Sequence, residues 1–238
     1  MGSLKDIKDE LQNAVVPGKA KDLMRFFKTG PGEYGEGDIF IGVTVPEQRK
    51  IARRHYKNIT STDLEKLLQD PCHECRLTAL FLLRLRYEKA DSAAEREELV
   101  ELYLSNLDYV NNWDLVDSSA PYILGPYLYG KDPALLYELA KSGELWRQRV
   151  AVLATAYFIR EGRFDETLSL AEKLLDHPHD LMHKAVGWML REVGNRDLDC
   201  EMEFLKKYHC RMPRTMLRYA IEKFEPELRK KILKGQAW

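Results

Sequence analysis

Apolar residues recur at three- and four-residue spacing along most of the chain, which is the period of an amphipathic α-helix. This pattern predicts helices over residues 63–69, 74–90, 93–105, 133–141, 145–159 and 167–175. The alternation of apolar and polar residues that is typical of β-strands is almost absent. Residues 39–43 are the one plausible strand, but the capping-box pattern at residues 44–47 favours entry into a helix. The chain is therefore expected to be all-helical.

Short helices joined by short loops suggest a repeat architecture, so internal similarity is the next feature to test. Residues 75–79, 116–120, 148–152 and 183–187 align with one another, and residues 48–52 and 213–217 extend the series. Two-helix HEAT or armadillo units run at about 40 residues, with variation in the loops. We therefore expect an α-solenoid of about six HEAT-like helical pairs, forming one domain over residues 1–238.

In a solenoid, equivalent positions of successive repeats form a column on one face. We call the second residue of each aligned segment its register position. All but one of the register positions are cationic, and a line of cations contacts the phosphates of a polyanion without reading its sequence. A structural ion pair or a helix cap is the alternative for each cation. The cationic register positions are Arg49, Arg76, Arg149, Lys184 and Arg214.

Asp117 is the one acid in this column, and a carboxylate facing a phosphate-binding groove needs a cation partner or a chemical role. Trp113 lies four residues earlier and shares its helix face. Asp114 would raise the pKa of Asp117 if both carboxyls were buried. Trp188 lies close to the register residue Lys184, so both tryptophans are expected to be exposed in the groove.

The composition constrains the partners. The formal charge is −1, so any DNA binding must use a segregated basic patch rather than an overall basic field. The chain has no secretory signal pattern and no run of about 18 apolar residues, so we expect no membrane association and a cytoplasmic location, associated with the nucleoid when bound to DNA.

Two motifs have metal-ligand spacing. Cys72 and Cys75 could form a structural zinc site with Cys200, His209 and Cys210, but the second group lacks the tight spacing of a zinc ribbon. Cys75 is also in phase with the apolar positions of its helix, which favours a packed thiol. The spacing of His179 and His183 resembles a zinc-hydrolase motif, but Asp180 replaces its glutamate and no third ligand stands at a sensible spacing. We expect no metal and no other cofactor.

Several segments together resemble the AlkD-type DNA alkylation repair glycosylases, which are built of HEAT-like repeats. The resemblance implies that the solenoid is right-handed and curved, with a concave DNA-binding face. The similar segments are residues 113–117, 146–149 and 184–192, and residues 40–43 with Pro46, Glu47 and Arg49 match the N-terminal signature of that family. The resemblance extends from about Leu23 to the last helices. The order and spacing of these segments together make it specific.

The resemblance implies a monofunctional glycosylase that removes cationic N3- and N7-alkylated purines from duplex DNA without base flipping. Asp117 matches the catalytic aspartate, and Trp113 and Trp188 match the tryptophans that hold the sugar of the damaged nucleotide. Arg149 matches an arginine of the same cleft. Cations that contact DNA phosphates in the family match Arg49 and Arg191.

Three positions depart from the family pattern. Phe26 stands where a tyrosine is expected, Asn112 replaces a second tryptophan, and Tyr157 stands where a DNA-contacting lysine is expected. These differences bear on the range of lesions accepted. The chain is expected to act as a monomer on alkylated double-stranded DNA. The alternative is a non-catalytic repeat module that binds DNA or protein, in which Asp117 forms a structural ion pair with Arg76 or Arg149.

Overall fold

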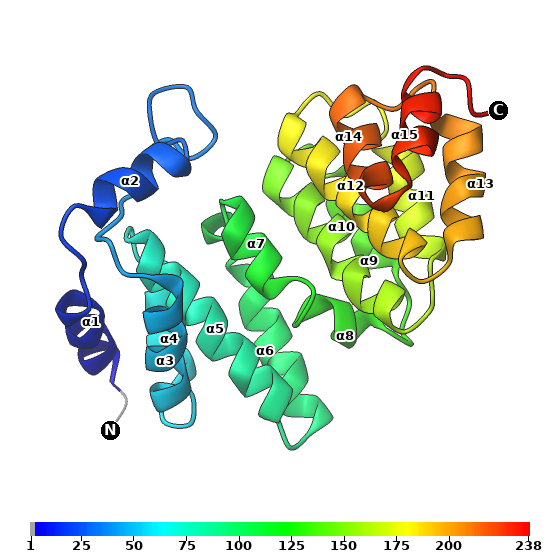
Figure 1. Cartoon of the computed structure of the whole chain (residues 1–238). Coiled ribbons are helices and arrows are strands. Elements are labelled where there is room, and N and C mark those ends of the chain that lie inside the picture. The colour runs from blue at the N-terminus through cyan, green and yellow to red at the C-terminus, as the bar shows by residue number, and fades with distance from the viewer. Residues whose placement is uncertain (1–2) are drawn as a thin grey trace. The chain divides into compact units, whose positions relative to one another are not determined.

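The computed structural model describes residues 3–238, and in this range the chain forms fifteen α-helices, two short 3-10 helices and no strand (Figure 1). A single isolated bridge pairs Ile39 with Cys72. The all-helical prediction is confirmed. The chain divides into two compact units, the first ending at Ile123 and the second beginning at Leu124. That these units form the one domain expected from the sequence stays a prediction.

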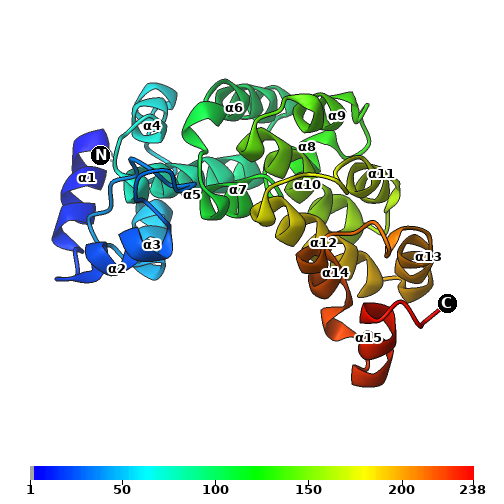
Figure 2. The ribbon, with the colours of Figure 1, turned by 90° about the horizontal axis from the view of Figure 1, so that it is seen from above.

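In the first unit, α5 (His73–Lys89) is the central helix. It packs against α3 (Val45–His55), α4 (Ser61–Leu68), α6 (Ala93–Ser105) and α7 (Trp113–Ser119), as Figure 2 shows. Most residues of α5 are buried on every side, because its apolar positions surround the helix rather than forming one stripe. The remaining elements are α1 (Leu4–Asn13), α2 (Lys19–Phe26) and the 3-10 turn Leu107–Tyr109.

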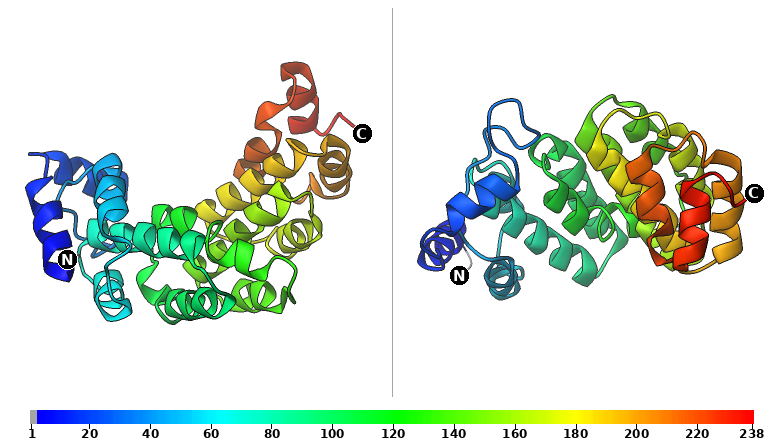
Figure 3. Two further views of the ribbon diagram at one scale, coloured as in Figure 1. Left: turned by 90° about the horizontal axis from the view of Figure 1, so that it is seen from below. Right: turned by 45° about the horizontal axis from the view of Figure 1, so that its top comes forward.

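The second unit has two layers. Helices α10 (Leu145–Arg160), α12 (Asp180–Gly194) and α14 (Arg214–Ala220) lie side by side, and α9 (Ala134–Lys141), α11 (Asp165–Lys173) and α13 (Leu198–Tyr208) pack against them (Figure 3). The remaining elements are α8 (Leu124–Leu128), the 3-10 turn Ile221–Lys223 and α15 (Pro226–Leu233).

Helices α12 and α14 approach each other closely at Gly187. A Cβ atom at this position would collide with the carbonyl oxygen of Met216 and with the side chain of Tyr219. The glycine in this segment therefore has a packing role, because only a residue without a side chain permits this backbone approach.

The repeat alignment identifies equivalent helices within each unit. In the first unit its register positions fall on the successive neighbours α3, α5 and α7, and in the second on α10, α12 and α14. The sequence pattern therefore locates one layer of each unit correctly. No helix within residues 3–238 has the length and apolar character needed to cross a membrane.

The helix ends agree with the expectation to within about two residues, and residues 93–105 match α6 in full. The capping box at the start of α3 is not formed. Thr44 is the N-cap residue, but within the described chain its side chain makes no capping hydrogen bond. The side chain of Gln48 instead donates to the carbonyl of Val43 at 2.9 Å. Helices α1 and α2, in which charged residues dominate, were not predicted.

Candidate functional site

Trp113 and Asp117 lie one turn apart on α7, and both are half-buried. The helix begins at Trp113 because Asn112 caps it: the Asn112 side-chain oxygen accepts a hydrogen bond from the Trp113 amide at 2.9 Å. Asn112 is completely buried. Asn112 therefore sets the start of the helix that carries Asp117.

The indole of Trp113 is supported by a cluster of aromatic rings. Phe27 stacks on it with ring centroids 5.2 Å apart, and Phe26 meets it edge-on at 5.8 Å. Phe27 in turn stacks on the buried ring of Phe40 at 5.0 Å. Phe26 is 62% exposed and places an aromatic edge beside the tryptophan. The cluster fixes the position of the indole.

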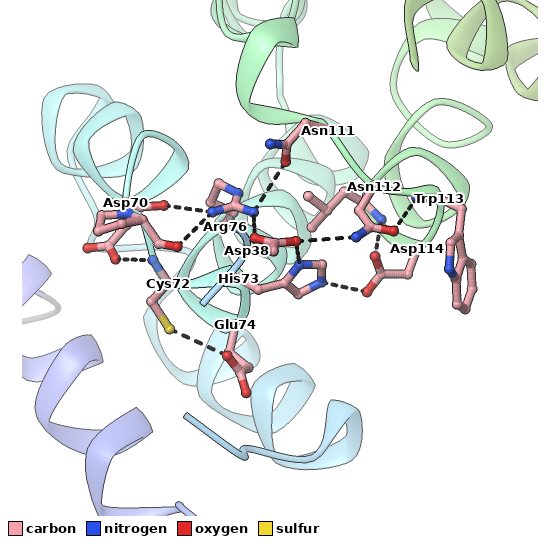
Figure 4. A network of polar contacts seen from close by, with 12 residues as sticks. Asp38, Asp70, Cys72, His73, Glu74, Arg76, Asn111, Asn112, Trp113 and Asp114 are labelled. Carbon is pink, nitrogen blue, oxygen red and sulfur yellow. Dashed lines mark hydrogen bonds and ion pairs between the residues drawn. The ribbon is translucent and has the colours of Figure 1, made fainter. Parts of the chain in front are cut away.

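A buried histidine joins α5 to α7 (Figure 4). His73 is 1% exposed, its Nδ1 lies 2.7 Å from Asp38 Oδ2, and its Nε2 lies 2.8 Å from Asp114 Oδ2. Burial opposes charge on the ring, but the hydrogen bonds and charges of Asp114 and Asp38 raise the pKa of His73 to about 9. Phe40 stacks on the ring with centroids 4.4 Å apart. At neutral pH the ring therefore carries a proton on each nitrogen and donates to both carboxylates.

Asp38 is the hub of the same network. Besides His73, it accepts hydrogen bonds from the guanidinium of Arg76 and, at 3.2 Å, from the side-chain amide of Asn112. Burial raises the pKa of Asp38, but the bond to His73 and the charges of His73 and Arg76 outweigh it, and the net shift is downward. The network therefore holds the loop that contains Asp38, the start of α5 and the cap of α7 in one arrangement.

Two further residues singled out from the sequence belong to this network. Arg76 is only 4% exposed, and its guanidinium is bound to Asp38, to the carbonyls of Asp70 and Pro71 at 3.0 Å each, and to Asn111 at 3.2 Å. These bonds give Arg76 a structural role in the first unit, and its contact with DNA stays a prediction. Asp114 accepts from His73, whose charge compensates it, and its effect on the pKa of Asp117 stays a prediction.

Arg49, by contrast, is exposed and lines a cleft of about 410 Å³ in the first unit. Its guanidinium lies 5.1 Å from the ring centroid of Phe81. Arg84, in the same cleft, lies 3.4 Å from the ring centroid of Tyr122 and pairs with Glu88. Arg53 contributes a further cation. The cleft thus places arginines beside aromatic rings on one face of the unit.

The remaining predicted site residues belong to the second unit. Arg149 is buried, and its Nη1 donates to the carbonyl of Leu181 at 2.6 Å. Trp188 is half-buried, and its indole N–H donates to Glu192 at 2.9 Å. The roles that the resemblance implies for both stay predictions.

The other predicted DNA contacts of the second unit are held by intramolecular bonds. Lys184 pairs with Asp180 at 2.8 Å, and Arg191 forms an ion pair with Glu222. Arg214 is exposed and donates to the carbonyl of Leu233 at 2.6 Å. Their contacts with DNA also stay predictions.

The histidines of the second unit are engaged with their own backbone. Nε2 of His183 bonds to the carbonyl of His177, and Nδ1 of His179 accepts the amide of Leu181 at 3.1 Å. Over residues 3–238, the side chains that converge as metal ligands do are Asp70, Cys72 and Cys75. Cys75 is also buried, as its place in the apolar pattern predicted.

The network around His73 was not found from the sequence. Asp38 lies 35 residues before His73, and Asp114 lies 41 residues after it, so no local spacing connects them. The available signal is a histidine in the first turn of a helix whose middle, residues 77–83, is largely apolar.

The layered helices and the half-buried carboxylate beside a supported indole define an all-helical, repeat-like protein with a candidate site on α7. The family model described as DNA alkylation repair enzyme matches residues 7–224, and the chain therefore belongs to this family.

A solved structure described as a predicted DNA alkylation repair enzyme from Enterococcus faecalis has a similar fold. Its TM-score is 0.71 at 17% identity, and the match covers 89% of this chain and 97% of that one. At this identity the likeness concerns the fold alone. No curated protein matches the sequence.

Proposed function

We propose that the protein is a DNA glycosylase that hydrolyses the N-glycosidic bond of cationic N3- and N7-alkylated purines in duplex DNA, without base flipping. Membership of the DNA alkylation repair enzyme family supports a role in repair and action on DNA. The observation that carries the finer proposal is the pair on α7: a half-buried carboxylate, Asp117, one helical turn from the supported indole of Trp113.

The chemistry follows from the charge of the lesion. An alkylated purine is cationic, so its glycosidic bond is weakened and the base leaves with little need for protonation. The enzyme has to stabilise the oxocarbenium-like sugar and position a water molecule. A carboxylate next to the sugar performs the first task electrostatically and the second as a general base. In a partly buried site its attraction for the developing cation is stronger than in bulk water.

Trp113 adds a second source of stabilisation. The face of an indole attracts a cation through the ring quadrupole, and this contributes about 1–2 kcal/mol when the cation is desolvated. The contact requires a fixed ring, and the stacking of Phe27 supplies that support. In this proposal Asp117 and Trp113 act on the sugar from neighbouring turns of one helix.

The direct test uses a duplex oligonucleotide with one 7-methylguanine. The protein should release intact 7-methylguanine and leave an abasic site with an uncut backbone. Loss of the methyl group with guanine still attached to the duplex would identify a dealkylase instead. Binding of the duplex without any release would favour the non-catalytic module.

A further inference from the structure

The connection between α4 and α5 gathers two thiols and a carboxylate. Cys72 is the N-cap residue of α5, Cys75 lies in its first turn, and Asp70 precedes Cys72 by two residues. One sulfur or oxygen atom from each lies within 4.8 Å of the other two. Asp70 is 8% exposed and Cys75 is 5% exposed, so the cluster is largely screened from water.

We propose that Asp70, Cys72 and Cys75 bind one Zn²⁺ ion, which fastens the α4–α5 connection to the first turn of α5. This site is independent of the proposed glycosylase activity. Two thiolates and a carboxylate form the kind of donor set that selects zinc over Mg²⁺ or Ca²⁺, which prefer oxygen ligands alone.

The ligand atoms are already close to the distances that zinc requires. In a tetrahedral site with Zn–S near 2.3 Å and Zn–O near 2.0 Å, neighbouring ligand atoms lie about 3.5–3.8 Å apart. The atoms of the cluster would therefore close by about 1 Å, which rotation of the cysteine and aspartate side chains accommodates. A water molecule would fill the fourth position, because the Glu74 carboxylate, although its Oε2 lies 3.4 Å from Cys72 Sγ, accepts the backbone amides of Ile41, Gly42 and Val43.

Local electrostatics also favour the thiolate ligands. The amides of the first turn of a helix carry partial positive charge, and both sulfurs stand at the start of a 17-residue helix. The ammonium of Lys8 forms an ion pair with Asp70, and it competes with the metal for this carboxylate. Exchange of two thiol protons for one dication leaves the net charge of the cluster unchanged, so the buried connection gains no uncompensated charge.

Hydrogen bonds within the protein already orient Asp70, one of the three proposed ligands. Asp70 Oδ1 accepts the backbone amide of Cys72 at 2.8 Å, and Arg76 holds the carbonyl of Asp70 at 3.0 Å. Hydrogen bonds to a ligating carboxylate fix its direction, as outer-shell partners do in zinc proteins. The sequence alone favoured a packed thiol at Cys75, and the position of Asp70 is what changes that interpretation.

Cobalt substitution tests the proposal on the full-length protein, reduced and freed of metal. Titration with Co²⁺ should give one equivalent of a tetrahedral species with a thiolate-to-cobalt charge-transfer band, and Zn²⁺ should displace it. Cys72→Ser and Cys75→Ser should each weaken Co²⁺ binding by more than about 100-fold, beyond the effect of losing an outer-shell partner. The double variant Cys200→Ser/Cys210→Ser is the matched control and should keep the band.

Two further variants keep the test decisive if a cysteine variant folds poorly. Asp70→Asn retains an acceptor for the Cys72 amide but loses the anionic ligand, so Co²⁺ binding should weaken by about tenfold. Lys8→Gln removes the competing ammonium, so binding should tighten. The proposal is overturned if the wild-type protein gives no charge-transfer band, if the band survives in Cys75→Ser, or if the Cys200→Ser/Cys210→Ser control loses it.

Discussion

Nε2 of His73 lies 2.8 Å from Oδ2 of Asp114, and this bond joins the first residue of α5 to the first turn of α7. The ring has a second carboxylate partner in Asp38 at 2.7 Å, so one imidazole links two segments that are distant in the sequence. The helix held in this way carries both Trp113 and Asp117. The bond therefore positions the candidate site without belonging to it.

Replacement of Asp114 by asparagine should destabilise the first unit and slow base release. An amide oxygen still accepts from His73 but has lost the charge, and a hydrogen bond to a charged group contributes about 1.5–3 kcal/mol. Urea unfolding should show a loss of about 1.5–2 kcal/mol, at the lower end of that range. Asp199→Asn, at an exposed position on α13, is the control and should behave as wild type. Unchanged stability of Asp114→Asn would show that the bond does not hold α7.

Trp113 should tolerate phenylalanine better than alanine. An aromatic ring can still stack on Phe27, whereas alanine leaves neither the stack nor a face for the sugar cation. Loss of about 1–2 kcal/mol of transition-state stabilisation corresponds to roughly 5- to 30-fold in rate. Single-turnover release of 7-methylguanine should fall by this amount in Trp113→Ala and by less in Trp113→Phe. Equal rates for the two variants would mean that the aromatic face has no role.

Arg49→Ala should weaken DNA binding for all sequences alike. The exposed guanidinium is expected to neutralise one phosphate, so its removal should lower the slope of log K against log salt by about 1. Lys66→Ala, at an exposed position on α4, is the matched control and should leave the slope unchanged. Fluorescence anisotropy over a salt series measures both. An unaltered slope for Arg49→Ala would remove this residue from the DNA contacts.

A buried glutamate should make the second unit less stable as the pH rises. Glu201 is 1% exposed, and over the described chain its Oε1 has no hydrogen-bond partner. Burial raises the pKa of Glu201 from 4.5 to about 8, against the opposing charge of Arg191. Between these two values the unfolded chain loses its proton while the folded protein keeps it. The stability contributed by this group is therefore fully present below about pH 4.5 and is lost as the pH rises through about 8.

Glu201→Gln should abolish this dependence, because the amide is neutral at every pH. The variant should be more stable than wild type by about 1–3 kcal/mol at pH 8 and similar to it at pH 5, as judged by urea unfolding. Glu203→Gln, at an exposed position on the same helix, is the control. If Glu201→Gln keeps the wild-type pH profile, the carboxyl group is not the cause.

The sequence predicted the parts of this protein that depend on local patterns. Helix periodicity is such a pattern, and so is the repeat register that places Arg49 on α3 and Asp117 on α7, two helices of the same layer. The network of Asp38 and His73 depends instead on how α5 and α7 pack, and no local spacing reports that. Arg76 is a second example. It holds the same register position in its repeat as Arg49 does, but the packing around α5 buries it, and the sequence pattern does not report that packing.

The cluster at the start of α5 is an intermediate case. The sequence predicts Cys72 and Cys75 as candidate metal ligands from their spacing. It does not predict Asp70 as a ligand, because a carboxylate two residues before a cysteine points toward it only when the turn is fixed. Here the Cys72 amide bonds to Asp70 Oδ1 at 2.8 Å and fixes that direction.

The rate of 7-methylguanine release by Asp117→Asn tests the central claim most directly. The amide keeps the size of the side chain but cannot stabilise the sugar cation by charge or act as a base. Single-turnover release from a methylated duplex should fall by at least about 100-fold, with DNA affinity retained and with Asp199→Asn as the unaffected control. Release by Asp117→Asn at the wild-type rate would contradict the assignment of Asp117 as the catalytic carboxylate.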